Sequence, residues 1–311
     1  MDSLAILQTY RKIIARYIVN ERNITSDVSA GDTSISVEST RRFNIGEKIA
    51  IIDTASQKAE VAVIEDIPDY RTITLSSPTV ASYISDEYGS ANIIRKILGY
   101  ETGIEGFIQA IYLGEPEVIS HYPAITIDLK TRNSEWLTLE STKESYSIDI
   151  SIYVLAQDYL TQFELMHTYV DYIEQALFRS FYPLVSPYNT ASLAEDVNGS
   201  DIVIKIADAD IENFEHVCSG WLWIENIDYL LYNRVSRYMG NGVYELTRPV
   251  GHDMYAGDTV IAPTRHIYNT LPESTQFGTI NKGTMLKCAR ISIKAEEEVW
   301  RGVPYVDPLT F

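Results

Sequence analysis

A β-rich stretch occurs twice in this chain, and the repeat constrains the fold more than any other feature. The copies span residues 24–95 and 196–263. Each contains a short alternating strand, an apolar strand after a glycine, a third strand, a turn, a strand ending in Leu-x-x-Pro, and a final strand. Repeats have to be recognised before a fold is assigned, because a missed repeat misassigns the whole chain. We therefore expect two similar small all-β domains, with the remaining residues forming a third unit.

That third unit has the pattern of an α+β layer. Ser3 can cap a helix over 3–21, in which Leu4, Leu7, Ile14 and Ile18 recur at helical spacing. Residues 123–129 form a strand led in by proline, and residues 146–155 alternate apolar and polar side chains. A second helix over 158–178 carries a single apolar seam, made of Phe163, Met166, Val170, Ile173 and Leu177.

The rest of this unit reads as loops and one late strand. Residues 130–145 are polar and are expected to form a loop. Residues 264–283 are a second loop with little hydrophobic pattern, and a strand follows over 285–295. The predicted organisation is one discontinuous α+β domain, 1–23 with 96–195 and 264–311, in which helices pack on a mixed or antiparallel sheet. The two β domains interrupt it at surface loops, where insertion costs little stability.

The bulk properties exclude several classes of function. The formal net charge of −18 argues against a groove that binds nucleic acid by neutralising phosphates. No apolar run approaches the roughly 18 residues of a membrane helix. The first residues lack a signal-peptide pattern, and Cys218 and Cys288 form no recognisable spacing. We expect a soluble protein with reduced thiols, without a membrane anchor.

No pattern of catalytic residues is evident. The five histidines are scattered, and no zinc-type or Cys-x-x-Cys spacing occurs. The glycines at 240–242 indicate a hairpin turn that requires positive φ, not a phosphate loop. Trp221 and Trp223 flank Leu222 and share one face of a strand, which favours core packing or a subunit contact over a sugar platform. We predict that the protein is not an enzyme and needs no metal or cofactor.

The order of elements in the α+β unit resembles the tail terminator proteins of long-tailed bacteriophages. The resemblance rests on the N-terminal helix, the proline-led strand at 123–129, the strand at 147–155, the helix at 158–178 and the late strand at 287–295. The β copies resemble a small β module of virion proteins, with the pattern Gly-Asp-Thr-x-Ile-x-Val at 31–37 followed by Phe-x-x-Gly-Glu-x-Ile-x-Ile at 43–51. Compact terminators lack such insertions, so the chain could also be a neighbouring neck protein instead of a terminator.

The resemblance implies a ring-forming virion protein. Terminators assemble as rings, usually of six copies, at the head-proximal end of the tail tube. The implied partners are further copies, the tail tube protein, neck or connector proteins, and sheath or collar proteins. DNA would pass through the lumen without specific binding, repelled by acidic side chains. Candidates for the ring or lumen surface, together with the 130–145 loop, are Asp128, Glu135, Glu140, Glu144 and Asp149.

Two further surfaces are candidates for partner contacts. A C-terminal arm that carries Trp300, Tyr305 and Phe311 would reach a neighbour, and the β domains would decorate the outside. The alternative is another neck or connector protein, or a baseplate or fibre adaptor. In the adaptor, the β modules would bind a virion partner or a glycan through Trp221 and Trp223.

Overall fold

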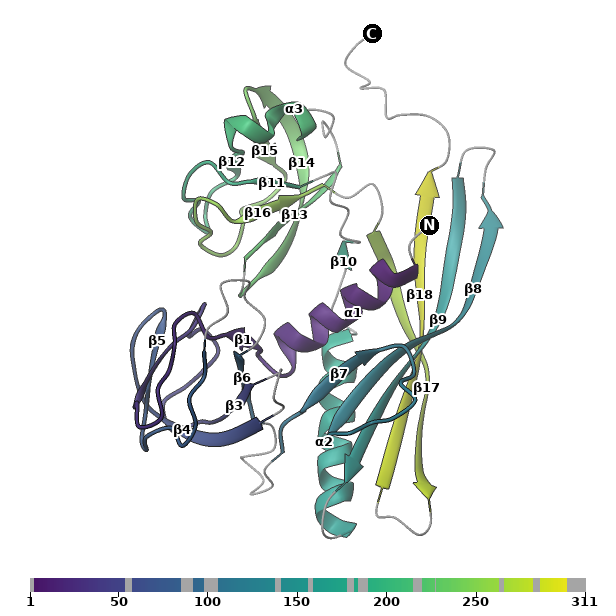
Figure 1. The fold of residues 1–311 in the computed structure, drawn as a ribbon. Coiled ribbons are helices and arrows are strands. Elements are labelled where there is room, and N and C mark those ends of the chain that lie inside the picture. Colours follow the sequence, from purple (N-terminus) through teal and green to yellow (C-terminus); the bar gives the residue numbers. More distant parts are fainter. Residues whose placement is uncertain are drawn as a thin grey trace.

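The computed structural model describes residues 3–53, 58–84, 92–97, 106–137, 141–155, 159–177, 182–183, 190–214, 220–226, 228–262, 266–281 and 286–300. They form three six-stranded sheets and two long helices, α1 (Ser3–Tyr17) and α2 (Tyr159–Leu177) (Figure 1). The predicted class is confirmed: one α+β unit is combined with two β modules.

The α+β unit is built on a sheet with the strand order β10-β17-β18-β9-β8-β7. Its neighbours are antiparallel except for β7 and β8, which are parallel. We call it the host sheet. Its strands are β7 (Ala110–Leu113), β8 (Ala124–Trp136), β9 (Ser141–Leu155), β10 (Tyr182–Pro183), β17 (His266–Asn281) and β18 (Leu286–Trp300).

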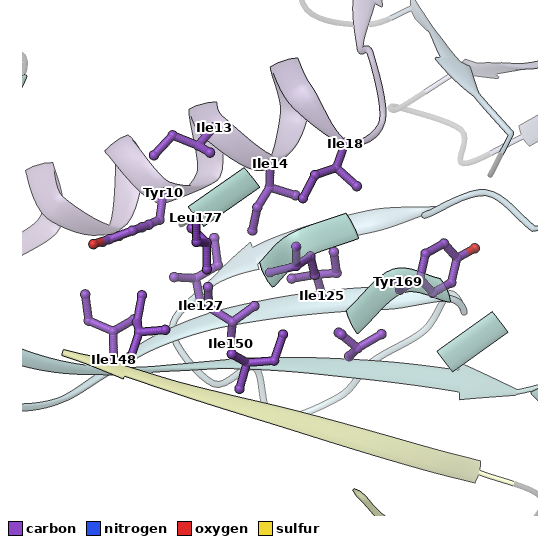
Figure 2. Packing of buried hydrophobic residues seen from close by; sticks show 14 of the residues in the cluster. Tyr10, Ile13, Ile14, Ile18, Ile125, Ile127, Ile148, Ile150, Tyr169 and Leu177 are labelled. Atoms are coloured by element: carbon purple, nitrogen blue, oxygen red, sulfur yellow. The ribbon is translucent and has the colours of Figure 1, made fainter. Parts of the chain in front are cut away.

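Alternation in β9 fixes which face of the host sheet is buried. Ile148, Ile150 and Ile152 are fully buried and pack with residues of both helices (Figure 2). The helices supply Tyr10, Ile13 and Ile14 from α1, and Leu165, Met166, Tyr169, Val170, Ile173 and Leu177 from α2. Each buried isoleucine contributes roughly 1.5–3 kcal/mol, so this shared core holds the host together.

Two details of the predicted helices are wrong. α1 ends at Tyr17 instead of residue 21, and Leu4 remains 47% exposed near its start. On α2, Phe163 is 42% exposed; its ring stacks with Tyr159 and contacts His167 in a tilted arrangement instead of entering the core. Leu165 and Tyr169 take the buried positions on that side. The buried face of α2 is therefore rotated relative to the predicted seam.

Both segments predicted as loops are largely strands. The polar excursion at 130–145 continues β8 to Trp136 and begins β9 at Ser141, so it forms the end of a long hairpin. The segment at 264–283 contains β17, which pairs along its length with β18. Both were missed because their side chains are mostly polar and exposed. Alternation in hydrophobicity appears only where one face of a strand is buried.

The two β modules share one topology, as the repeat predicts. The first sheet has the order β1-β6-β3-β4-β5-β2 and the second β11-β16-β13-β14-β15-β12, so strands correspond one to one. The first module contains β1 (Arg22–Asn23), β2 (Ser34–Ser36), β3 (Lys48–Asp53), β4 (Lys58–Asp69), β5 (Thr72–Leu75) and β6 (Asn92–Lys96). The second contains β11 (Thr190–Ser192), β12 (Val203–Lys205), α3 (Ile211–Phe214), β13 (Trp221–Glu225), β14 (Leu230–Gly240), β15 (Val243–Leu246) and β16 (Thr259–Ile261).

Equivalent turns confirm the alignment. Asp32 accepts a hydrogen bond from the Ser29 amide, and Asp201 accepts one from the Asn198 amide. Asn241 and Gly242 both have positive φ in the two-residue turn between β14 and β15, as the glycines predict. Strand β11 pairs with β16, so the second sheet begins before the predicted domain boundary at 196.

Candidate assembly surface

Among the residues that the structure describes, no helix covers one face of the host sheet. Both helices lie on its other face, and the β modules lie on that same side in Figure 1. The uncovered face displays alternate residues of β8, β9 and β18, and its centre is lined by small hydroxyl side chains. They are Thr131, Ser145, Ser147 and Ser292, which are at least partly exposed, whereas Thr126 and Ser151 are on the same side of the sheet but are buried. We call this surface the helix-free face.

Charges on the helix-free face are paired. Lys130 contacts Asp128 at 2.5 Å, and Arg290 lies 3.6 Å from Asp149. Lys143 and Lys294 each lie 2.9 Å from Glu296. Hydrogen bonds from the two lysines lower the pKa of Glu296 to about 2. The carboxylate is therefore ionised at neutral pH, and its charge is balanced locally.

The structure separates the predicted lumen residues. Asp128 and Asp149 lie on the helix-free face as partners of Lys130 and Arg290, and Ser292 also donates a hydrogen bond to Asp149 at 2.7 Å. Glu135 is exposed near the end of β8. Glu140 lies outside the described residues. The uniformly acidic lumen surface that we expected is not formed by these residues, because Asp128 and Asp149 have basic neighbours.

Glu144 is fully buried, so the prediction that it lies on a ring or lumen surface is wrong for the folded chain. It accepts hydrogen bonds from Arg132 at 2.9 Å and Ser134 at 2.6 Å. Glu297 pairs with it across β9 and β18, is also fully buried, and accepts a hydrogen bond from the Tyr146 hydroxyl. This buried polar layer continues the core beyond its last isoleucines. It holds the hairpin of β8 and β9 to β18.

Of the other predicted contact residues, the structure describes Trp221, Trp223 and Trp300. Trp300 is the last residue of β18, while Tyr305 and Phe311 lie outside the described residues. Trp221 begins β13. Trp223 is fully buried, which excludes it from the predicted β-module surface. Leu222 and Ile224 fill the module core, so Trp223 projects from the opposite side of β13 and is covered there by other parts of the chain.

Two strands of the host sheet expose part of their outer edge. Strand β7 pairs with β8 only at Ala124–Ile127, and β10 pairs with β17 only at His266 and Ile267. Within the described part of the chain, the outer edges of 129–136 in β8 and 271–278 in β17 have no neighbouring strand. These open edges lie on opposite sides of the sheet. Sequence reasoning missed them because it assigned 130–145 and 264–283 to loops.

A buried carboxylate joins the two β modules. Asp228, in the loop between β13 and β14, is fully buried and lies 3.1 Å from Arg22 of β1, which is 1% exposed. Its carboxylate also accepts hydrogen bonds from Ser39 at 2.8 Å and Tyr70 at 2.9 Å. Burial lowers the pKa of Arg22, and the negative charge of Asp228 opposes that effect. We call this contact the module junction.

The end of β13 and the loop that follows it also bind the host. Glu225, the last residue of β13, lies 2.6 Å from both Lys12 and Arg16 of α1, and the Asn226 carbonyl accepts a hydrogen bond from Arg16 at 2.9 Å. The two modules and α1 are therefore fixed to each other. Sequence reasoning could not find this junction, because its partners are separated by 158 to 206 positions and follow no local pattern.

The described residues contain no group of three or more His, Cys, Asp or Glu side chains arranged to hold a metal ion. Neither of the long helices, nor any other helix in those ranges, has the length and apolar character needed to span a bilayer. Acidic side chains are abundant, but the buried ones described above are occupied by structural hydrogen bonds and ion pairs.

Comparison with known proteins leaves the family open. No family model matches the chain, and no curated protein matches it. Among solved structures, the chain has a similarity to "Phage phi92 endosialidase" with 9% identity and a TM-score of 0.19. The aligned region covers 94% of this chain and 54% of that protein, so the chain spans about half of its length. A TM-score of this size does not establish a common fold.

Proposed function

We propose that this protein is a ring-forming virion structural protein. In this proposal it is the tail terminator at the head-proximal end of a phage tail tube, where it caps tube growth and joins the tail to the neck. The proposal rests on the host sheet, which, in the described part of the chain, has one helix-free face and an open strand edge on each side. A subunit that presents different complementary edges on its two sides can close a heterologous ring.

The helix-free face suits a channel for DNA. The basic side chains described on this face, Lys130, Lys143, Arg290 and Lys294, each have a carboxylate within 4 Å. Gripping DNA requires basic groups that neutralise phosphates, and these groups are already neutralised. DNA would therefore slide past hydroxyls and ion pairs. In this form of the proposal local charge balance replaces the acidic repulsion that the composition alone suggested.

The β modules would project to the outside of the ring. They lie on the helical side of the host sheet, away from the helix-free face (Figure 1). The module junction and the contacts of Glu225 with α1 hold them in fixed positions. A fixed pair of modules is suited to bracing neck, collar or sheath proteins. The glycan-adaptor alternative loses one of its two proposed ligand residues, because Trp223 is buried.

Electron microscopy of the purified protein, with and without assembled tail tubes, tests this function. We expect rings with a central hole of roughly 20 Å or wider, enough to admit a duplex. We also expect density at one end of each tube, and tubes that stop growing when the protein is added during polymerisation. A stable monomer at high concentration that neither forms rings nor binds tube ends would overturn the proposal.

A further inference from the structure

We infer that copies of this chain join through a shared β-sheet, in which the open edge of β8 in one copy pairs with the open edge of β17 in the next. The inference rests on the proposed ring and names the contact that closes it. It also fixes the occupant of these edges as a second copy of this chain.

Both edges are accessible along the stretches concerned. In β8, Lys130, Thr131 and 133–136 are exposed, and in β17, 271–274 and 276–278 are exposed. Each stretch is about eight residues long, or roughly 26 Å at the usual rise per residue. An open strand edge presents a row of backbone N–H and C=O groups that can bind another strand. Equal lengths allow the two stretches to satisfy one another.

The strand directions also agree. From β17 through β18 and β9 to β8, each strand is antiparallel to its neighbour. The four strands therefore alternate, and β8 runs opposite to β17. Placing a second copy beside the first in the same orientation sets its β17 antiparallel to β8. The contact continues the existing hydrogen-bonding pattern without inverting a subunit.

The two open edges are staggered along the strands. Ser274 of β17 pairs with Ser292 of β18, which pairs with Asp149 of β9, so Ser274 and Asp149 lie in one row across the sheet. Asn133 of β8 pairs with Ser145 of β9 and lies in another row. In β9 these rows differ by four residues, about 14 Å. Pairing Asn133 with Ser274 of the next copy therefore shifts each copy by four residues for every four strands.

That shift matches the requirement for closing a barrel. Four strands occupy about 19 Å across the sheet, so a shift of about 14 Å corresponds to a strand tilt of about 35° relative to the barrel axis. Closed barrels have tilts of about 35–45°, and a barrel whose shear equals its strand number has a tilt of about 36°. Six copies would give about 24 strands and a backbone diameter of about 45 Å. A duplex fits inside such a barrel.

Two short strands limit where a partner can pair among the described residues. Strand β7 occupies the edge of β8 before residue 129, and β10 occupies the edge of β17 at its beginning. Pro272 has no N–H and limits pairing near the start of the open stretch of β17. These features restrict other registers. In the staggered register, β17 continues past Gly278 to Asn281, beside the part of β8 that β7 occupies, so the contact requires β17 to diverge from β8 after Gly278. The open stretches of β8 and β17 therefore meet when neighbouring copies are shifted by four residues along the strands.

Disulfide cross-linking tests this contact. Asn133→Cys and Ser274→Cys, combined in a chain that also carries Cys218→Ser and Cys288→Ser, place two thiols on the helix-free faces of neighbouring copies. Paired residues of antiparallel strands have Cα atoms about 4.5–5.5 Å apart, which suits a disulfide. Thr131→Cys with Gln276→Cys tests the same register two residues along. The matched control is Ser147→Cys with Ser274→Cys, because Ser147 lies on the same face in the central strand β9.

On mild oxidation we expect both test pairs to give a covalent ladder that ends at the number of copies in the ring. Each single-cysteine variant and the control pair should remain monomeric on non-reducing gels. Rings seen by electron microscopy without a ladder from either test pair would overturn the edge contact while leaving the ring itself in place. Absence of rings in the unsubstituted protein would instead overturn the proposed function.

Discussion

Replacing Asp228 with alanine should release the two β modules from one another. The carboxylate is fully buried and contacts four groups of the first module: the guanidinium of Arg22 at 3.1 Å, the hydroxyl of Ser39 at 2.8 Å, the hydroxyl of Tyr70 at 2.9 Å and the guanidinium of the partly exposed Arg41 at 3.7 Å. Arg22 is 1% exposed, so the alanine variant leaves a cation buried without its partner.

The size of the effect follows from this burial. Removing one partner of a buried ion pair costs about 3–5 kcal/mol, because the remaining charge cannot regain its hydration. For a unit of 150–250 residues this corresponds to a decrease in the midpoint of thermal unfolding on the order of 10 °C. Asp228→Asn keeps the shape and some hydrogen bonds, so it should cost less, about 1–3 kcal/mol.

Urea unfolding and limited proteolysis measure this loss directly. Asp208→Ala is the matched control, because the Asp208 side chain is 82% exposed and its pairing with Lys205 at 3.7 Å is a surface contact. The double variant Arg22→Met with Asp228→Leu removes both charges and should recover most of the stability lost in Asp228→Ala. If Asp228→Ala proved no less stable than Asp208→Ala, the buried carboxylate would not hold the two modules together.

Three further predictions concern the core, a turn and an ion pair. Ile150→Ala should lower the free energy of unfolding by about 2–5 kcal/mol, because Ile150 is fully buried in the host core. Denaturant titration measures this loss, and a loss below about 1 kcal/mol would contradict the packing. Gly242→Ala should destabilise the second module by about 1–2 kcal/mol, since its φ is +72° and an added Cβ would lie 2.9 Å from Ile206 and Ile211; hydrogen exchange in β14 and β15 should rise, whereas unchanged exchange would argue against the turn. The pKa of Glu296 is lowered from 4.5 to about 2, so its stabilising contribution is present above pH 4.5 and disappears as the pH falls towards 2. In Glu296→Gln, the urea midpoint should therefore fall less between pH 5 and pH 3 than in the unsubstituted protein. An unaltered pH profile would exclude a stabilising role for the Glu296 carboxylate.

The sequence determined more of the fold than of the candidate site. The order of strands, with a glycine before the second strand and a strand that ends in Leu-x-x-Pro, identified the repeat. Hydrogen bonds to Asp32 and Asp201 in equivalent turns agree with it. Alternation in β9 identified the buried face of the host sheet. Strand β17 was missed because its exposed edge position leaves no alternating pattern. The buried states of Glu144, Trp223 and Asp228 depend on distant contacts, which no local pattern encodes.

The module junction also ties together two points of the chain on either side of the host segment 97–189. In the unfolded host, ends that are free to separate have more conformations than ends held together. Closing a loop of about 90 residues removes about 4 kcal/mol of chain entropy, by the logarithmic dependence on loop length. Once the modules have folded and docked, the host segment behaves as a cyclised chain. The unfolded host segment then has fewer conformations, so the inserted domains also raise the free energy of unfolding of the fold that they interrupt.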